Sequence, residues 1–251
     1  MTALKQYLPV LSEQFKIRSY HTDQNKYLKV NYLTAFIQEA AWNHANHLDL
    51  GWEFLHREGV VWMLARIFFE IKEYPVWRDE IIIETWPKGT DGLFYVRDMI
   101  ICNLKGTKLG AATTYWMLVD LKLKRPRIPE LHTAILTANK DKHAVNKRLE
   151  KLRISSGKEI DTIKARISDI DLNDHVNSNI YLEWIVNNME DILIQGRIIR
   201  SIQMNYLSEV KQGENVKLFR SHTDNIPEEI LFEGLKDDKS KVCFQAAVTI
   251  G

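Results

Sequence analysis

Three polar side chains of complementary chemistry stand directly before a predicted helix in the second half of the chain. Asp171, Asn173 and His175 are spaced by two residues, and in an extended segment this spacing projects their side chains to one side. A carboxylate, an amide and an imidazole brought together could orient a carbonyl group and transfer a proton. The helix N-terminus that follows offers unpaired backbone N–H groups, which can stabilise a developing oxyanion. The segment is a candidate site for acid–base chemistry on a carbonyl compound.

The same residue types also have a structural use, because Asp, Asn and Ser cap helices and form turns. A second copy of the motif bears on this choice. An offset of 148 residues superimposes Asp23 and Asn25 on the later aspartate and asparagine, whereas Tyr27 stands where the second copy has His175. If Asp and Asn suffice for the turn in both copies, the histidine needs another explanation.

The elements around the two motifs also repeat, which indicates an internal duplication. Apolar residues at steps of three and four predict one helix in each half, over residues 31–48 and 179–192. Runs of β-branched and aromatic residues follow each helix. In the first half they cover 60–71, 81–86, 94–103 and 109–120, after a short strand near 15–18; in the second they cover 198–210, 215–220, 229–235 and 241–250. The fold class is therefore α+β.

A further carboxylate, Glu209, is placed by this pattern at the end of the strand that starts the second set. It shares a face of that strand with Gln203, Asn205 and Leu207. A glutamate at a strand end ordinarily faces solvent. The pattern alone therefore assigns Glu209 no chemistry.

Composition excludes several classes of protein. The 251 residues carry a net charge of +1 and are 45% apolar, enough to build a packed core. No apolar run reaches the roughly 18 residues of a membrane span, and the N-terminus lacks the apolar segment of a signal peptide, so we expect a cytoplasmic protein. Cys102 and Cys243 form no metal or disulfide motif, and no nucleotide-binding signature occurs, so we expect no cofactor and no metal. The near-neutral charge argues against nucleic-acid binding.

The charge is unevenly distributed along the chain. Between Leu121 and Lys158, eleven basic residues stand against three acidic ones, a local charge of +8. We interpret residues 129–157 as a basic linker between an N-terminal repeat over 1–128 and a C-terminal repeat over 158–251. A solvated linker is the simplest explanation of this charge.

Longer motifs resemble those of the acyl-acyl carrier protein thioesterases of plants and bacteria. In the second half they are DLNDHVNSNIYLEW from Asp171 and IQMNYLSEV from Ile202. In the first half they are FIQEAAWNH from Phe36, VWMLAR from Val61, the pair Arg97-Asp98 and YWMLVD from Tyr115. The resemblance extends over roughly residues 12–250. It implies a double hotdog fold, in which each repeat is a long helix wrapped by a curved antiparallel sheet.

The resemblance also implies roles for particular residues. Asp171, Asn173 and His175 match the family's catalytic aspartate, asparagine and histidine, and Glu209 matches its later glutamate. The cysteine that follows this glutamate in plant members is Val210 here. A mechanism with a cysteine nucleophile at that position is therefore excluded.

We accordingly expect hydrolysis of fatty acyl-acyl carrier protein to free fatty acid. Glu209, oriented with His175, would activate water, or Asp171 would attack the thioester directly. Backbone N–H groups of Val176 and Asn177 would bind the oxyanion. The family's acyl tunnel lies mainly in the N-terminal half, where the bulky candidates are Phe36, Trp52, Trp62 and Met63.

Acyl carrier protein would be the partner, and carrier proteins of this type are acidic. Lys147, Arg148 and Lys151 are therefore candidates for docking it. The chain would be a monomer with an internal pseudo-dimer, or a homodimer. Two alternatives stay open: a hotdog acyl-CoA thioesterase or hydratase, and a non-catalytic module that binds acyl thioesters.

Overall fold

The computed structural model describes residues 7–129, 136–154, 157–194, 196–223, 226–237 and 241–251. Two compact units divide the chain. The first comprises Met1–Ala65 and Glu73–Lys147, and the second comprises Arg66–Lys72 and Arg148–Gly251. The two units thus divide within the segment expected as a linker, of which residues 130–135 and 155–156 lie outside the described residues. The division into residues 1–128, 129–157 and 158–251 stays a prediction.

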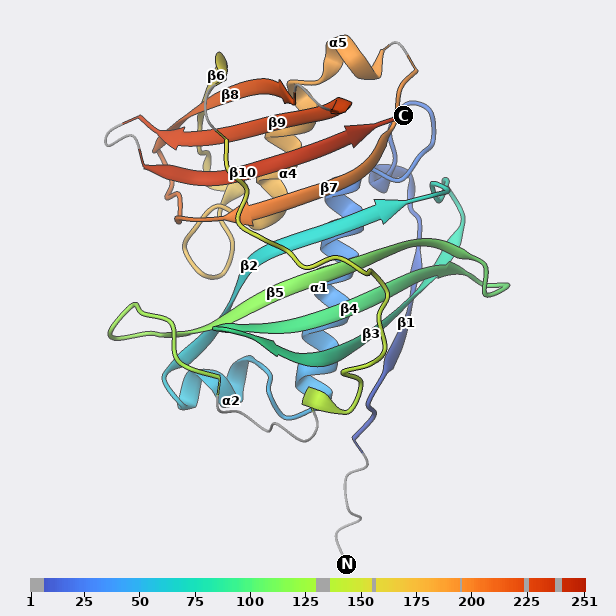
Figure 1. Cartoon of the computed structure of the whole chain (residues 1–251), viewed down its shortest axis with the longest axis vertical. Helices are drawn as coiled ribbons and strands as arrows, with labels where there is room; N and C mark the ends of the chain where they lie inside the picture. The colour runs from blue at the N-terminus through green and yellow to red at the C-terminus, as the bar shows by residue number, and fades with distance from the viewer. Residues whose placement is uncertain (1–6, 130–135, 155–156, 195, 224–225, 238–240) are drawn as a thin grey trace, which may run out of the picture. The chain divides into compact units, whose positions relative to one another are not determined.

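The first unit is a helix packed on an antiparallel sheet. Its strands β1 (Leu11–Lys16), β3 (Glu80–Asp91), β4 (Phe94–Asn103) and β5 (Lys108–Asp120) are hydrogen-bonded in that order. Helix α1 (Val30–His47) lies along one face of these strands, and α2 (Trp52–Arg57) follows it (Figure 1). Strand β2 (Val60–Ile71) begins in this unit and ends in the second.

The apolar stripe of α1 explains its position. Leu33, Ile37 and Ala40 recur at steps of four and three and are at most 1% exposed, so they face the sheet. The predicted helix over 31–48 is confirmed within one residue at each end.

The second unit repeats the plan. Strands β7 (Ile199–Tyr206), β10 (Val242–Ile250), β9 (Ile226–Lys236), β8 (Asn215–Thr223) and β6 (Lys158–Lys164) are neighbours in that order, and Arg66–Glu70 of β2 pairs with β7. The helix of this unit is α4 (Ser178–Asn187), followed by the short α5 (Glu190–Leu193).

The continuous helix predicted over 179–192 is wrong, because Asn188 interrupts it. The Asn188 side chain donates to the Trp184 carbonyl at 3.0 Å, and its backbone N–H bonds Ile185 three residues back. An Asn side chain that competes for helix carbonyls in this way ends the helix.

The turn before each long helix is built identically in the two units. In the first, the Asp23 N–H donates to the Tyr27 carbonyl at 2.9 Å; in the second, the Asp171 N–H donates to the His175 carbonyl at 2.9 Å. The aspartate Oδ1 also accepts the N–H two residues on in both units, at 2.9 Å and 2.8 Å. The predicted duplication is therefore confirmed in the hydrogen bonds of this turn.

Each turn also contains a residue in the left-handed region, Lys26 at φ 70° and Asp174 at φ 63°. Aspartate tolerates this conformation better than most residues. The side chains of Asp23 and Asp171 are explained by the N–H groups they accept in these turns, and His175 stands where the first copy has Tyr27.

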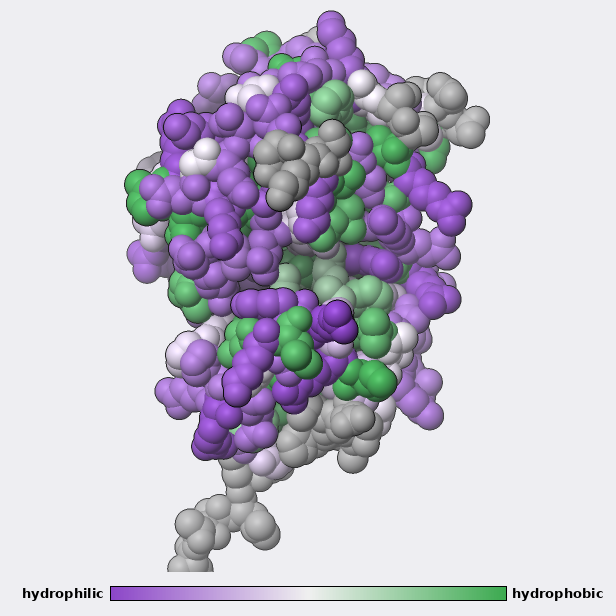
Figure 2. All heavy atoms as spheres, turned by 90° about the vertical axis from the view of Figure 1, so that its left-hand side faces the viewer, coloured by the Kyte–Doolittle hydropathy of each residue, from purple (hydrophilic) through white to green (hydrophobic). Residues whose placement is uncertain are grey.

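Among the described residues, no helix combines the length and apolar character needed to cross a bilayer. The face of the molecule in Figure 2 carries mostly hydrophilic side chains, with apolar ones in small groups. Both cysteines are free. The expected cytoplasmic location stays a prediction.

Candidate functional site

Histidine and glutamate meet at the surface of the second unit. His175 Nε2 lies 2.8 Å from Glu209 Oε2, and the two side chains are 21% and 44% exposed. Glu209 does not lie on a strand as expected, because β7 ends at Tyr206. It lies in the loop that follows, so the side chain is positioned by that loop.

Backbone hydrogen bonds fix both partners. The Val176 N–H donates to the Val210 carbonyl at 2.8 Å, which joins the residue after His175 to the residue after Glu209. The loop is held in turn by the Cys243 carbonyl, which accepts from Leu207 at 2.8 Å and from Ser208 at 3.1 Å. The imidazole and the carboxylate therefore meet because their backbones are tied together.

This pair has the geometry of an acid–base couple. An ionised carboxylate that accepts the imidazole Nε2–H fixes the tautomer and leaves Nδ1 as an acceptor. Both side chains are partly exposed, so water can reach either. The pair could therefore take a proton from a water molecule that attacks a carbonyl carbon.

The other two predicted catalytic residues make different contacts. Asp171 Oδ1 accepts the Asn173 N–H at 2.8 Å, and its Oδ2 lies 3.5 Å from Asn177 Nδ2. The Asn173 side chain is exposed and makes no hydrogen bond to any described residue. The structure thus joins His175 to Glu209 directly and joins Asp171 to the same turn, but it forms no bond between Asp171 or Asn173 and the imidazole.

The two expected oxyanion donors need a correction. The Val176 N–H is bonded to Val210, and the Asn177 N–H is bonded to the Asp169 carbonyl at 2.8 Å. Leu28 and Lys29 make the equivalent bonds in the first unit, at 2.9 Å and 3.0 Å. These N–H groups hold the turn in both copies and are not available to a ligand.

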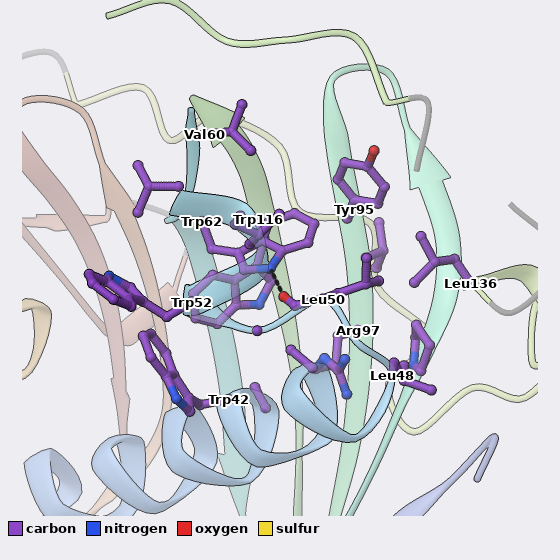
Figure 3. Close-up of a pocket in the computed structure, with 17 residues that line it drawn as sticks. Trp42, Leu48, Leu50, Trp52, Val60, Trp62, Tyr95, Arg97, Trp116 and Leu136 are labelled. Atoms are coloured by element: carbon purple, nitrogen blue, oxygen red, sulfur yellow. Dashed lines mark hydrogen bonds between the residues drawn. The ribbon is translucent and has the colours of Figure 1, made fainter. Parts of the chain in front are cut away.

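A pocket opens in the first unit beside α1 and α2. It encloses about 750 Å³, a volume that includes the open solvent at its mouth. Figure 3 shows tryptophan and leucine side chains around it, with the Trp62 indole bonded to the Leu50 carbonyl at 3.0 Å. The walls are apolar, which suits a hydrocarbon chain.

Two of the four expected chain-binding residues line this pocket. They are Trp52 and Trp62. Phe36 lies outside the lining and stacks on Phe15 with ring centroids 4.8 Å apart. Met63 is half-buried on β2 and also lies outside the lining.

Among the described residues one charged side chain lines the pocket, and no role in the pocket was predicted for it from the sequence. Arg97 on β4 is 8% exposed and donates from Nη1 to His44 Nδ1 at 2.8 Å and to Thr85 Oγ1 at 3.1 Å. Two charges in the middle of an apolar strand, Arg97 and Asp98, were the available signal.

The basic residues proposed for docking are exposed. Lys147, Arg148 and Lys151 face solvent, whereas Leu149 between them is 1% exposed. In the second unit, the Leu149 carbonyl accepts from Arg66 Nη1. This part of the basic segment is therefore anchored to the second unit by its backbone.

Comparisons with known proteins agree along the chain. The family model for the acyl-ACP thioesterase N-terminal domain matches residues 9–135, and that for the C-terminal domain matches residues 153–246. Oleoyl-acyl carrier protein thioesterase 2 of Arabidopsis thaliana is 26% identical over 235 residues, covering 85% of this chain and 63% of its own length. The chain therefore spans less than two thirds of that plant relative.

Solved structures match over nearly the full chain. A crystal structure of an acyl-ACP thioesterase from Bacteroides thetaiotaomicron has a TM-score of 0.89 at 26% identity, covering 97% of this chain and 98% of that one. The 12:0-ACP thioesterase from Umbellularia californica has a TM-score of 0.83 at 21% identity and covers 99% of each chain, which bears on the fold alone. The predicted α+β fold of two hotdog repeats is confirmed.

Proposed function

The chain belongs to the acyl-ACP thioesterase family, and on that premise we propose that it hydrolyses fatty acyl-acyl carrier protein to a free fatty acid and the carrier thiol. The observation that carries this proposal is the 2.8 Å contact between His175 and Glu209. His175 belongs to a turn whose counterpart in the first unit has the same backbone hydrogen bond and a tyrosine, Tyr27, in place of the histidine.

In the proposed reaction the His175–Glu209 pair accepts a proton from water as the water oxygen attacks the thioester carbonyl. The tetrahedral intermediate then expels the sulfur, which leaves as the carrier thiol after it takes a proton. Asp171 and Asn173 orient the reacting groups from the adjoining turn. A direct attack by Asp171, through an acyl anhydride, is the competing route.

Two features of the chain support an attack by water and separate roles for the two repeats. Val210 follows Glu209, so no thiol stands at that position. The pocket of the first unit has mainly apolar walls, which suit a hydrocarbon chain. We therefore propose that the first repeat holds the acyl chain and the second repeat performs the chemistry.

The acyl carrier protein is the proposed partner, with Lys147, Arg148 and Lys151 as its docking residues. Their exposure supports this role, because exposed cations can attract an acidic partner over several ångströms.

Thiol release from a panel of acyl-carrier proteins, followed with a colorimetric thiol reagent, tests the proposal. We expect turnover of palmitoyl-carrier protein or a shorter homologue, with palmitoyl-CoA hydrolysed less efficiently. A clear preference for the CoA thioester would identify an acyl-CoA thioesterase instead. Binding of acyl thioester without thiol release would identify a non-catalytic module.

A further inference from the structure

The pocket of the first unit contains a buried cation that its lining does not neutralise. Arg97 is the one charged residue among the described side chains that line it, and only 8% of Arg97 is exposed. Figure 3 shows Arg97 beside α1, next to the leucines of the pocket. A charge buried beside apolar walls is costly unless a partner of opposite charge is present.

No carboxylate of the described residues pairs with this guanidinium. The neighbouring Asp98 is on the opposite face of β4, since side chains alternate along a strand. Asp98 Oδ2 accepts from Lys88 Nζ at 2.8 Å and from the Ala144 N–H at 2.8 Å. The acid next to Arg97 in sequence therefore neutralises a different cation.

The partners that Arg97 does have are neutral. Burial and the Arg97 charge together lower the pKa of His44 to about 4, so the imidazole is uncharged at neutral pH. Its Nε2–H donates to the Leu8 carbonyl at 2.9 Å, which leaves Nδ1 to accept from Arg97. Burial lowers the pKa of Arg97 to about 10, and the guanidinium keeps its charge.

The N–H groups on Nε and Nη2 of the guanidinium can donate to a ligand. The hydrogen bonds of Arg97 to His44 and to Thr85 both use Nη1. Among the described residues Nε and Nη2 have no hydrogen-bond partner, and a guanidinium can offer such a pair of donors to the two oxygens of one carboxylate.

We propose that this pocket binds an apolar chain that ends in a carboxylate, with the carboxylate on Arg97 and the chain against the tryptophans. Two molecules share this chemistry. One is a free fatty acid, which enters with its carboxylate first. The other is the acyl group of a dicarboxylic acid, whose far end reaches Arg97, and this second source rests on the proposed function.

Ligand binding tests the shared chemistry without any need for turnover. Trp42, Trp52, Trp62 and Trp116 line the pocket, so quenching of tryptophan fluorescence reports occupancy. We expect dodecanoate to bind wild-type protein roughly tenfold or more tightly than dodecan-1-ol, as a charge-assisted hydrogen bond predicts. Equal affinities would overturn the proposal, and this comparison needs no variant.

Substitutions of Arg97, with a control at Lys108, locate the anion site. Arg97→Gln should reduce the preference for dodecanoate to about twofold or less, whereas Lys108→Gln, which removes a cation outside the lining, should leave it intact. Arg97→Lys keeps the charge and should retain part of the preference if the glutamine variant does not fold. A preference that persists in folded Arg97→Gln protein would overturn the assignment.

Hydrolysis distinguishes the two sources. If kcat/KM for the carrier-protein thioester of dodecanedioic acid exceeds that for the dodecanoyl thioester, the ligand is the far end of an acyl group. If only free dodecanoate shows the preference, the ligand is the fatty acid itself. Absence of all thiol release would contradict the proposed function and leave the binding result standing.

Discussion

His175 Nε2 lies 2.8 Å from Glu209 Oε2, although helix α4 and strand β7 separate the two residues along the chain. The backbone bond from Val176 to Val210 places them opposite each other. The first unit has the same turn with Tyr27 in place of the histidine. The pair is therefore an addition to a scaffold that both repeats share, and the scaffold itself supplies matched controls.

Replacement of Asp171 by Asn separates chemistry from turn formation. The asparagine oxygen can still accept the Asn173 N–H, so Asp171→Asn should fold normally while kcat falls about 100-fold. Asp23→Asn makes the same change in the equivalent turn of the first unit. Its turnover should stay within about twofold of wild type. Equal activities of the two variants would assign Asp171 to the turn alone.

Chain-length preference should respond to the residues that line the pocket. Trp62→Leu enlarges the pocket, and we expect the ratio of kcat/KM for long over short acyl chains to rise by about tenfold. Phe36→Leu is the control, because Phe36 stacks on Phe15 outside the lining. A shift in Phe36→Leu with none in Trp62→Leu would place the acyl chain elsewhere.

The free energy of unfolding should decrease as the pH is lowered, because of His44. Its pKa is about 4 in the folded chain against 6.5 for the unfolded reference. Between these pH values the unfolded state binds more protons than the folded state. The contribution of the neutral His44 to the free energy of unfolding is therefore complete above pH 6.5 and is lost as the pH falls towards 4. Between pH 7.5 and pH 5 the loss is about 2 kcal/mol.

Urea unfolding at the two pH values measures this loss. His44→Gln removes the titrating group and keeps an acceptor for Arg97, so the pH dependence should shrink by that amount. His56→Gln, at an exposed position of the same unit, should leave it unchanged. An undiminished pH dependence in His44→Gln would refute the assignment to His44.

Charge reversal tests docking of the carrier protein. Glutamate at Lys147, Arg148 and Lys151 should raise KM for acyl-carrier protein several-fold, most clearly at low salt, and leave turnover of acyl-CoA unchanged. Lys105→Glu reverses an exposed cation in the turn after β4 and serves as the control. An unchanged KM in the triple variant would exclude this surface.

Periodic features of the fold were predictable from sequence, whereas contacts between distant residues were not. The spacing of Leu33, Ile37 and Ala40 predicts α1 because burial of one face decides the helix. The break at Asn188 escaped the pattern, since one side-chain bond to Trp184 decides it.

The site shows the same division. Motif and duplication together singled out His175, but the end of β7 at Tyr206 and the bonds that occupy the N–H groups of Val176 and Asn177 depend on tertiary pairing. Arg97 was visible in the sequence as a charge in an apolar strand. Its proposed role in ligand binding depends on contact with His44 and on the pocket, and only the folded chain brings these together.

Thiol release from dodecanoyl-carrier protein by Glu209→Gln tests the central claim most directly. We expect kcat to fall about 100-fold or more in Glu209→Gln and by a similar factor in His175→Ala. The kcat of the double variant should be no lower than that of the single variants, because the two residues act as a unit. Val210→Ala keeps the carbonyl that holds the turn and should retain turnover. Wild-type turnover in Glu209→Gln would contradict the account.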